Sequence, residues 1–274
     1  MPENTFFFLT KQRKGRKEKM QKKTEKRKEK IAKAAVAALM AFSLVSDEIP
    51  AKAKSSPVPK GLNEMVSGFT EMKQAFTLGP EADPKLLKGL ERRLDPKLVH
   101  VSNIVDYYKW ERYRDSVTGK TIKYVYKGKY RITKNQEKQA QKKINSIATS
   151  AKKIKNKEQR VRRIYRDVTK GVSYRSGRQY CYTSYGALVK KQACCQGISD
   201  AFALACGRAG IKTQIISGKS TMDGNTAHMW TRVYVNGSWL YCDPTWDIDA
   251  SRPRFLMKSE GYFRKTGHKA AGSL

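Results

Sequence analysis

Residues 193–211 read ACCQGISDAFALACGRAGI, and this stretch carries the decisive signal for the fold. From Cys195 onward, apolar residues recur at spacings of three and four, which predicts a mostly buried helix that ends near Gly207 and Gly210. Two adjacent cysteines open the predicted helix. A cysteine pair at this place can fill the core, form half of a disulfide, bind a metal or act as a nucleophile.

A thiol in the first turn of a helix differs chemically from a thiol in the middle of a core. The unpaired backbone N–H groups and the helix dipole at that end favour the thiolate. Cys194 and Cys195 both have this position, whereas Cys206 lies at the buried far end of the predicted helix. A nucleophilic thiol also needs a base within hydrogen-bond reach and a third group that orients the base.

The choice of base is narrow because the chain has three histidines. His100 lies far upstream and His268 lies in the C-terminal tail. His228 opens a run of alternating apolar and polar residues that follows the predicted thiol helix. We therefore predict that His228 is the base.

A β-hairpin is predicted over the segment that contains His228. Residues 227–235 read AHMWTRVYV, and residues 238–242 read SWLYC. The intervening Asn236-Gly237 is the strongest short hairpin signal, because both positions of a type I′ turn need a positive φ. A two-residue loop pairs Val235 with Ser238 and thereby fixes the register of the whole hairpin.

The register selects a candidate for the orienting acid. Asp243 falls on the same face as His228 as a diagonal neighbour, about 7–8 Å away at the level of the Cα atoms. Asp247 would also lie on the same face as His228, at the opposite diagonal position, and is the alternative candidate for the orienting acid. Pro244 cannot donate to a β-ladder, so regular pairing is expected to fail before Asp247. This favours Asp243.

Other elements follow from the same kind of pattern. Helices are predicted over 84–94, 135–151 and 156–170, the last with Asn156 as N-cap and Gly171 as its stop. The segment 104–132 is rich in aromatic and β-branched residues, and its DSVTGK and KGK sequences suggest the two turns of a three-stranded meander. KTQIISG, at 212–218, is predicted to be a strand.

Four segments together resemble the transglutaminase-like superfamily of cysteine acyl-transfer proteins, and in particular its bacterial exported members. The resemblance covers residues 157–263. Its pieces, in order, are KEQRVRRIYRDVTKGVSY before the core, YTSYGALVKKQACCQGISDAFALACGRAGI around the nucleophile, AHMWTRVYVNGSWLYCDPTWD as the histidine and acid hairpin, and RFLMKSEGYF as the closing strand.

The resemblance implies an α+β fold of the papain-like, transglutaminase-like kind, with the nucleophile helix packed on an antiparallel sheet. It also implies which cysteine reacts, because the nucleophile of the family immediately precedes the Gln-Gly pair, and that residue is Cys195 here. By the same motif the base is His228 and the acid is Asp243. Cys194 departs from the family pattern, which leaves a strained vicinal disulfide or a redox-masked thiol as alternatives.

The expected mechanism is attack of the Cys195 thiolate on a peptide or glutamine carboxamide carbonyl to form a thioester. The backbone N–H of Cys195 is the expected oxyanion donor, and Gln192 is a weaker candidate. Trp230 and Trp239 share the face of His228 and are candidate walls of the acyl site, although packing is the simpler role for both. We favour a peptidase or amidase, with a cross-linking transglutaminase and a non-catalytic cell-surface binding module as the alternatives.

The formal net charge of +33 predicts association with polyanions, such as an anionic cell-wall polymer. A compositional bias that serves solubility explains the charge equally well. The sequence contains no RNP-like motif, zinc finger or basic heptad, so sequence-specific nucleic-acid binding is not expected. The predicted substrate is a peptide or protein, and the sequence gives no oligomeric state.

Residues 1–53 have the order of a secretory signal peptide: a basic region, an apolar run and the small-x-small AKA at 51–53. The basic region has ordinary length only if Met20 is the true start. A retained signal anchor is the alternative to cleavage. We expect a linker with a helical and β-meander region over 54–150 and the catalytic domain over 151–274, secreted or at the cell surface.

Five cysteines are an odd number, so an exported protein keeps at least one thiol free or paired between chains. The sequence does not say whether Cys181, Cys194, Cys206 and Cys242 pair. No CxxC and no zinc-type cysteine–histidine spacing occurs, so no structural metal is expected. No calcium loop of the D-x-D-x-D-G kind occurs either, and no cofactor is predicted.

Overall fold

The computed structural model describes residues 60–82, 94–222 and 224–271. These residues lie in one compact unit, which spans residues 56–274. The predicted signal peptide, the Met20 start and all but the last residue of the helix predicted over 84–94 lie outside the described residues. The division of the chain at residues 53 and 150 stays a prediction. Among the described residues, no helix is both long and apolar enough to cross a membrane.

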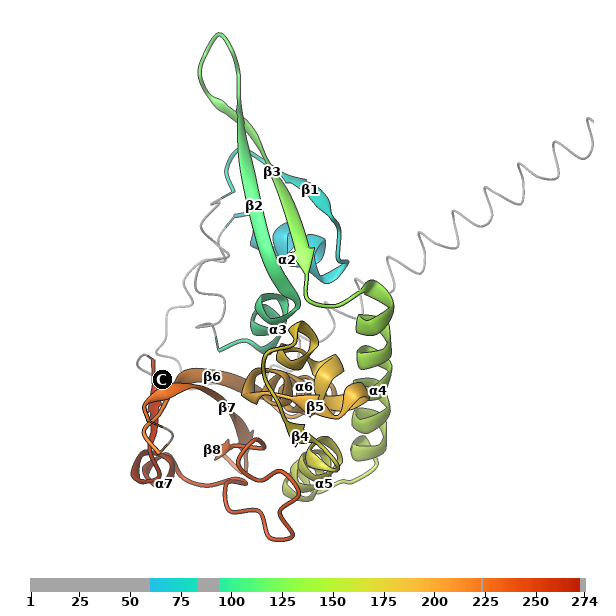
Figure 1. Cartoon of the computed structure of the whole chain (residues 1–274), viewed down its shortest axis with the longest axis vertical. Coiled ribbons are helices and arrows are strands. Elements are labelled where there is room, and N and C mark those ends of the chain that lie inside the picture. Colours follow the sequence, from blue (N-terminus) through green and yellow to red (C-terminus); the bar gives the residue numbers. More distant parts are fainter. Residues whose placement is uncertain (1–59, 83–93, 223, 272–274) are drawn as a thin grey trace, which may run out of the picture. The chain divides into compact units, whose positions relative to one another are not determined.

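The elements form two groups, which Figure 1 shows in colours that follow the sequence. A three-stranded sheet of order β1-β3-β2 and two short helices come first in the chain. Further helices and the four-stranded antiparallel sheet β8-β7-β6-β9 follow. The first group is α2 (Leu62–Thr70), β1 (Ala75–Leu78), α3 (Pro96–Ile104), β2 (Val105–Arg114) and β3 (Thr121–Tyr130). The second group is α4 (Lys134–Lys152), α5 (Lys157–Thr169), β4 (Ser173–Tyr174), η4 (Gln179–Tyr182), η5 (Gly186–Lys190), β5 (Gln192–Ala193), α6 (Cys195–Arg208), β6 (Thr213–Ser220), β7 (Thr226–Val235), β8 (Ser238–Cys242), α7 (Glu260–Lys265) and β9 (His268–Ala270).

The predicted α+β class is confirmed, with α6 as the central helix. Helix α6 contacts α3, α4 and α5 as well as strands β6 and β7 (Figure 1). Its residues from Gly197 to Cys206 are all buried, as the run of small and apolar side chains predicts. Gly197 allows the close approach of the preceding loop, because a Cβ at this position would lie 2.6 Å from the carbonyl oxygens of both Cys181 and Thr183.

The two helices predicted before α6 are confirmed. Helix α4 starts at a capping box formed by Thr133 and Gln136, and its apolar stripe, which includes Ala140 and Ile144, is buried. Helix α5 starts after Asn156, whose side chain accepts a hydrogen bond from the Gln159 backbone N–H. Caps of this kind satisfy N–H groups that the helix itself leaves without acceptors.

The predicted hairpin is also confirmed, with the predicted register. Asn236 and Gly237 both have positive φ, 52° and 78°, and Val235 pairs with Ser238. The β7–β8 ladder runs to the pair Thr231–Cys242 and stops there. Continuing the count would place Met229 opposite Pro244, which has no N–H to donate.

Two predictions of local structure are wrong. Residues 104–132 do not form a three-stranded meander, because Lys127, Gly128 and Lys129 lie inside β3 rather than in a turn. Tyr126 and Tyr130, on either side of Gly128, both contact the ring of Phe69 in α2, and this packing keeps the strand continuous. The third strand of that sheet is β1, which pairs with β3 from upstream in the chain.

The segment RFLMKSEGYF, residues 254–263, is not the closing strand. Lys258 makes a single bridge to Tyr241, and a helix, α7, begins at Glu260 with Ser259 as its N-cap. The strand that closes the sheet is β9, which pairs with β6. The capping residue at Ser259 interrupts the extended backbone before a ladder can form.

Helix α3 brings His100 into the core beside α6. His100 Nδ1 lies 2.9 Å from Asp200 Oδ2, and its Nε2 lies 3.2 Å from Glu137 Oε1. Burial opposes the charge on His100, but the two carboxylates raise its pKa to about 10. An imidazolium therefore joins α3, α4 and α6 through a buried network, a contact that the sequence position of His100 did not predict.

We expect His100→Gln to lower the free energy of unfolding at pH 7 by about 3–5 kcal/mol, because it leaves two buried carboxylates without their counter-charge. The folded pKa of His100 lies above its ordinary value of 6.5, so the stabilisation is fully present below pH 6.5 and is lost as the pH rises through about 10. Urea unfolding at pH 7 and pH 10.5 measures both effects.

The difference in stability between the native chain and His100→Gln should therefore shrink at pH 10.5. Lys109→Gln serves as the control, because it removes an exposed positive charge and should change stability by less than about 0.5 kcal/mol. A stability difference that is equal at both pH values would contradict a charged His100.

Candidate active site

Cys195 is the first residue of α6 and is 8% exposed. Its thiol faces the backbone N–H of Met229, the residue that follows His228 in β7. Cys195 and Met229 also share a small buried cluster with Val99 and Ile215. The structure thus brings the predicted nucleophile to the end of β7 that carries the predicted base.

The sequence explains why α6 meets β7 at this point. The backbone N–H and C=O of Met229 point toward β8, as those of Thr231 do. In the register of the hairpin, however, the residue that would pair with Met229 is Pro244. The backbone of Met229 is instead satisfied from α6: the Ser199 hydroxyl donates to its carbonyl at 3.0 Å, and its N–H faces the Cys195 thiol. The helix N-terminus therefore takes the place of the missing strand pair.

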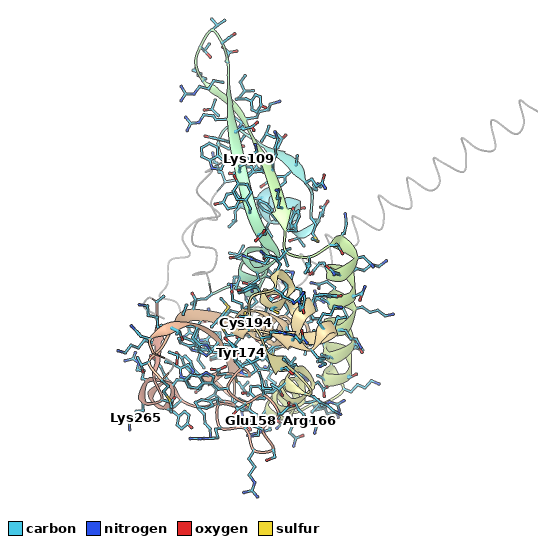
Figure 2. The ribbon with its side chains drawn as sticks, in the orientation of Figure 1. Lys109, Glu158, Arg166, Tyr174, Cys194 and Lys265 are labelled. Carbon is cyan, nitrogen blue, oxygen red and sulfur yellow. The ribbon has the colours of Figure 1, made fainter. Side chains whose placement is uncertain are left out.

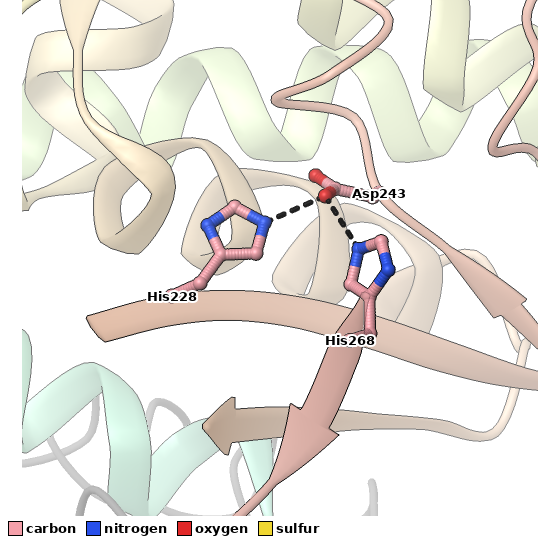
Figure 3. A group of neighbouring side chains, drawn as sticks. All are labelled: His228, Asp243 and His268. Carbon is pink, nitrogen blue, oxygen red and sulfur yellow. Dashed lines mark hydrogen bonds and ion pairs between the residues drawn. The ribbon is translucent and has the colours of Figure 1, made fainter. Parts of the chain in front are cut away.

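His228 and Asp243 are in direct contact, as the hairpin register predicts. His228 Nε2 lies 2.6 Å from Asp243 Oδ2 (Figure 3). Because Nε2 is used in this bond, Nδ1 is the ring nitrogen left to exchange a proton with a thiol. His228 is itself 7% exposed, so the pair is largely shielded from water.

Asp243 is fully buried and is held by several donors. Its Oδ1 accepts from the backbone N–H groups of Thr245, at 2.9 Å, and Trp246, at 3.3 Å. Burial alone would raise the pKa of Asp243, but hydrogen bonds from His228 and His268 keep it below the usual value. Asp243 is therefore an ionised carboxylate with a fixed orientation.

Asp247, the rival acid, is engaged elsewhere. Its carboxylate accepts from the backbone N–H groups of Arg254 and Phe255 and from the Tyr165 hydroxyl at 2.6 Å. The same hydroxyl lies 2.7 Å from the backbone carbonyl of Asp243. Asp247 thus fixes the loop that follows Asp243 to helix α5 and does not contact His228.

His268 is a site residue that the sequence reasoning missed. Its Nε2 lies 3.1 Å from Asp243 Oδ2, the oxygen that also bonds His228 (Figure 3). The contact forms because β9 pairs with β6 and places His268 opposite Ser220. A three-residue strand paired across some 50 residues leaves no periodic signal, so only the presence of a third histidine could have pointed to it.

His228, Asp243 and His268 are the set of described residues whose donor atoms could hold a metal ion, since these atoms lie within 4.8 Å of one another. Ligand atoms on a tetrahedral zinc ion, with bonds of about 2.0–2.1 Å, lie about 3.3 Å apart. The separation of 2.6 Å between His228 and Asp243 is instead that of a charge-assisted hydrogen bond. The geometry fits a hydrogen-bonded set.

The adjacent thiols of Cys194 and Cys195 interact with each other. The pKa of Cys194 is lowered to about 7, chiefly by a hydrogen bond with Cys195, with burial opposing and the backbone N–H groups of Gln196 and Gly197 helping. The same hydrogen bond and burial raise the pKa of Cys195. The two thiols therefore lose their protons in two separate steps, because the negative charge formed first opposes the second ionisation.

Cys194 also lies against the preceding loop. Its backbone N–H donates to the carbonyl of Cys181 at 3.1 Å, and its thiol lies 3.6 Å from the same oxygen. The thiols of Cys194 and Cys195 consequently have different surroundings, with Cys195 against β7 and Cys194 against the loop. All five cysteines are buried and carry free thiols in this structure.

Three further candidates from the sequence, Trp230, Trp239 and Gln192, lie in different places. Trp230 lies beside the site, with ring centroids 5.9 Å from His228 and 5.0 Å from His268. Trp239 contacts Tyr234 and Arg232 nearer the hairpin turn. The side-chain oxygen of Gln192 accepts from Arg175 and Tyr180.

A cavity of about 480 Å³ lies elsewhere, between α4, α5 and the turn at Lys170 and Gly171. None of the three predicted catalytic residues lines it. The cavity therefore lies apart from Cys195, His228 and Asp243.

Comparison with known proteins bears on the same part of the chain. Residues 145–244 match the transglutaminase-like superfamily, a span that contains Cys195, His228 and Asp243. No curated protein sequence matches the chain.

Three solved structures show distant likeness. A TGase has 17% identity and a TM-score of 0.37 over 57% of this chain and 48% of its own. A candidate cysteine protease from Cytophaga hutchinsonii has 14% identity and a TM-score of 0.35 over 56% of this chain and 66% of its own. The periplasmic domain of TgpA from Pseudomonas aeruginosa has 14% identity and a TM-score of 0.33 over 54% of this chain and 65% of its own. The chain thus spans about half to two thirds of the length of these proteins.

We expect Cys194→Ala to increase the rate of Cys195 alkylation by iodoacetamide at pH 7 by about 3-fold to 10-fold. The substitution removes the hydrogen bond and the negative charge that raise the pKa of Cys195. Mass spectrometry of tryptic peptides gives the rate at each cysteine. Cys206→Ala is the matched control, because Cys206 is buried at the far end of α6 and should leave the rate unchanged. Slower alkylation in a folded Cys194→Ala protein would mean that Cys194 assists Cys195.

Proposed function

The chain carries a core of the transglutaminase-like superfamily over residues 145–244, and from this premise we propose that it is a cysteine-dependent acyl-transfer enzyme. Its proposed substrates are peptide bonds or glutamine carboxamide groups, and its proposed intermediate is a thioester on Cys195. His228 is the proposed base and Asp243 the proposed orienting acid. We favour hydrolysis, as in a peptidase or amidase, because water needs no dedicated acceptor site.

One observation supports this proposal more than any other. A thiol at the N-terminus of a buried helix lies against the backbone of β7 next to His228, and His228 is bonded to a buried carboxylate at 2.6 Å. Nucleophile, base and orienting acid come from three separate elements, α6, β7 and the segment after β8. Packing alone does not require all three at one point.

In the first half-reaction, Nδ1 of His228 takes the proton of Cys195, and the thiolate attacks the carbonyl carbon. Asp243 stabilises the resulting imidazolium through the bond to Nε2. The backbone N–H of Cys195 is free to bind the oxyanion, because the first N–H groups of a helix have no intrahelical acceptor. His228 then gives its proton to the leaving amine or ammonia, and the thioester remains.

In the second half-reaction, His228 takes a proton from water, and the hydroxide attacks the thioester. The thiolate of Cys195 leaves, and the acid product departs. A primary amine in place of water gives a new amide by the same steps, which is the cross-linking outcome. The two reactions share one site and differ in the acceptor that reaches it.

We also propose that the basic surface binds an anionic polymer at the cell surface, where the signal-peptide pattern would direct the protein. Basic residues are spread over many elements of the described structure, such as Lys109 on β2, Arg166 on α5 and Lys265 on α7 (Figure 2). A distributed charge of this kind favours non-specific electrostatic association over recognition of one sequence.

The catalytic proposal is tested in the full chain with Cys194→Ala, so that one thiol of the pair remains. We expect iodoacetamide near pH 6 to modify Cys195 faster than Cys181, Cys206 or Cys242, and His228→Ala to abolish this preference. Equal and slow labelling of all four thiols would leave a non-catalytic binding module.

Turnover is measured with a library of glutamine-containing peptides, with and without a primary amine. Asp243→Asn should lower kcat/KM by about 100-fold or more with the fold intact, whereas Asp247→Asn is the matched control that keeps the His228 contact. Product acid in the presence of the amine indicates hydrolysis, and product amide indicates cross-linking. A larger loss in Asp247→Asn than in Asp243→Asn would contradict the assignment of the acid.

Association with polyanions is tested on a heparin column and with purified anionic cell-wall polymer. Retention should fall steeply between about 50 and 200 mM salt, because binding by many Lys and Arg side chains releases condensed counterions. Retention that does not change with salt would contradict a charge-driven interaction.

A further inference from the structure

We propose that His268 is a positioning residue of this site, which shares one oxygen of Asp243 with His228 and so limits how strongly Asp243 attracts a proton onto His228. The inference rests on the proposed function, since it concerns the same base and acid. His268 touches neither substrate nor thiol in this proposal. It acts through Asp243.

The first support is the convergence of two imidazoles on a single oxygen. His228 Nε2 and His268 Nε2 lie 2.6 Å and 3.1 Å from Asp243 Oδ2, and they approach it from two different strands (Figure 3). The other oxygen, Oδ1, is occupied by the backbone N–H groups of Thr245 and Trp246. The carboxylate therefore has all its acceptor positions filled, and neither imidazole can move to the other oxygen without breaking a bond.

The second support is the setting of His268, whose side chain has no exposed surface. Aromatic rings surround it, with centroids at 4.3 Å for Phe263, 4.4 Å for Trp246 and 5.0 Å for Trp230. A polar ring in such an apolar cage is costly unless its nitrogen atoms are bonded. Asp243 accepts from Nε2, and the Thr266 hydroxyl lies 3.5 Å from Nδ1.

The strand that carries His268 is held close to the site. Gly218 in β6 pairs with both His228 of β7 and Ala270 of β9. A Cβ at Gly218 would lie 2.1 Å from the carbonyl oxygen of Lys269 and 2.7 Å from the Trp230 ring. The glycine therefore permits the approach of β9 that puts His268 beside Asp243.

Charge balance assigns the role. Asp243 supplies one negative charge, which stabilises one imidazolium, and the mechanism places that imidazolium on His228. In this proposal His268 donates its Nε2–H to Asp243 Oδ2. A neutral donor on Oδ2 draws electron density from the oxygen that His228 uses, and it weakens the pull of Asp243 on the proton of His228.

Titratable groups from five elements interact with Asp243. His228 of β7 and His268 of β9 contact its Oδ2, and Cys195 of α6, Tyr165 of α5 and Cys242 of β8 interact with its charge. Removing the His268 donor should therefore strengthen the His228–Asp243 bond and stabilise the Cys195 thiolate–imidazolium pair. We therefore expect the Cys195 thiolate to form at lower pH when the His268 donor is removed.

The test uses the full chain with Cys194→Ala and follows the pH dependence of Cys195 alkylation between pH 4.5 and about 9. His268→Phe fills the aromatic cage and removes the donor. His268→Gln keeps an N–H donor in nearly the same place. We expect His268→Phe to be alkylated about 3-fold to 10-fold faster at pH 6, with its pH midpoint moved to lower pH. We expect His268→Gln to keep the midpoint of the parent protein.

A purely structural role would move both variants alike or neither, and either result overturns the proposal. A chelator that shifts the profile of the parent protein also overturns it, since the three side chains would then hold a metal. If His268→Phe does not fold, His268→Leu removes the same donor and is judged by the same criterion. A failure of the proposed function looks different, because Cys195 in the parent protein would then show no preferential alkylation.

Discussion

Pro244 has no backbone N–H, and the relation of Cys195 to His228 depends on this. The β7–β8 ladder ends at Thr231 and Cys242, two pairs before the position where Pro244 would face Met229. The open edge of Met229 is satisfied by Ser199 and Cys195 of α6. A hairpin that continued regularly would cover this edge and keep the helix N-terminus, with its thiol, away from His228.

Because the ladder ends at Cys242, the chain leaves the sheet after β8, and Asp243 is the first residue of this segment. The N–H of Asp243 turns to the carbonyl of Phe255, and the Asp243 side chain turns to His228. Tyr165 and Asp247 then fix the following loop against α5. Backbone bonds outside the ladder thus orient a carboxylate that burial alone would tend to protonate.

Local signals in the sequence predicted the parts of the site that lie in neighbouring segments. The Asn-Gly turn fixed the register that joins His228 to Asp243, and the small-residue run after Cys195 predicted the buried helix, because both depend on short-range backbone geometry. The choice between Cys194 and Cys195 came from family resemblance. The catalytic roles of Cys195, His228 and Asp243 remain proposals. The parts that were missed depend on long-range packing. His100 reaches Asp200 across 100 residues, and β1 and β9 join their sheets from distant segments.

Two of the three histidines were set aside on their distance along the chain, yet the fold buries all three against carboxylates. They differ in how many negative charges surround them. His100 has Asp200 and Glu137 and is held as an imidazolium, which suits a fixed link between helices. His228 and His268 share the single carboxylate of Asp243. That difference in local charge, which no spacing in the sequence records, distinguishes His100 from the two histidines that contact Asp243.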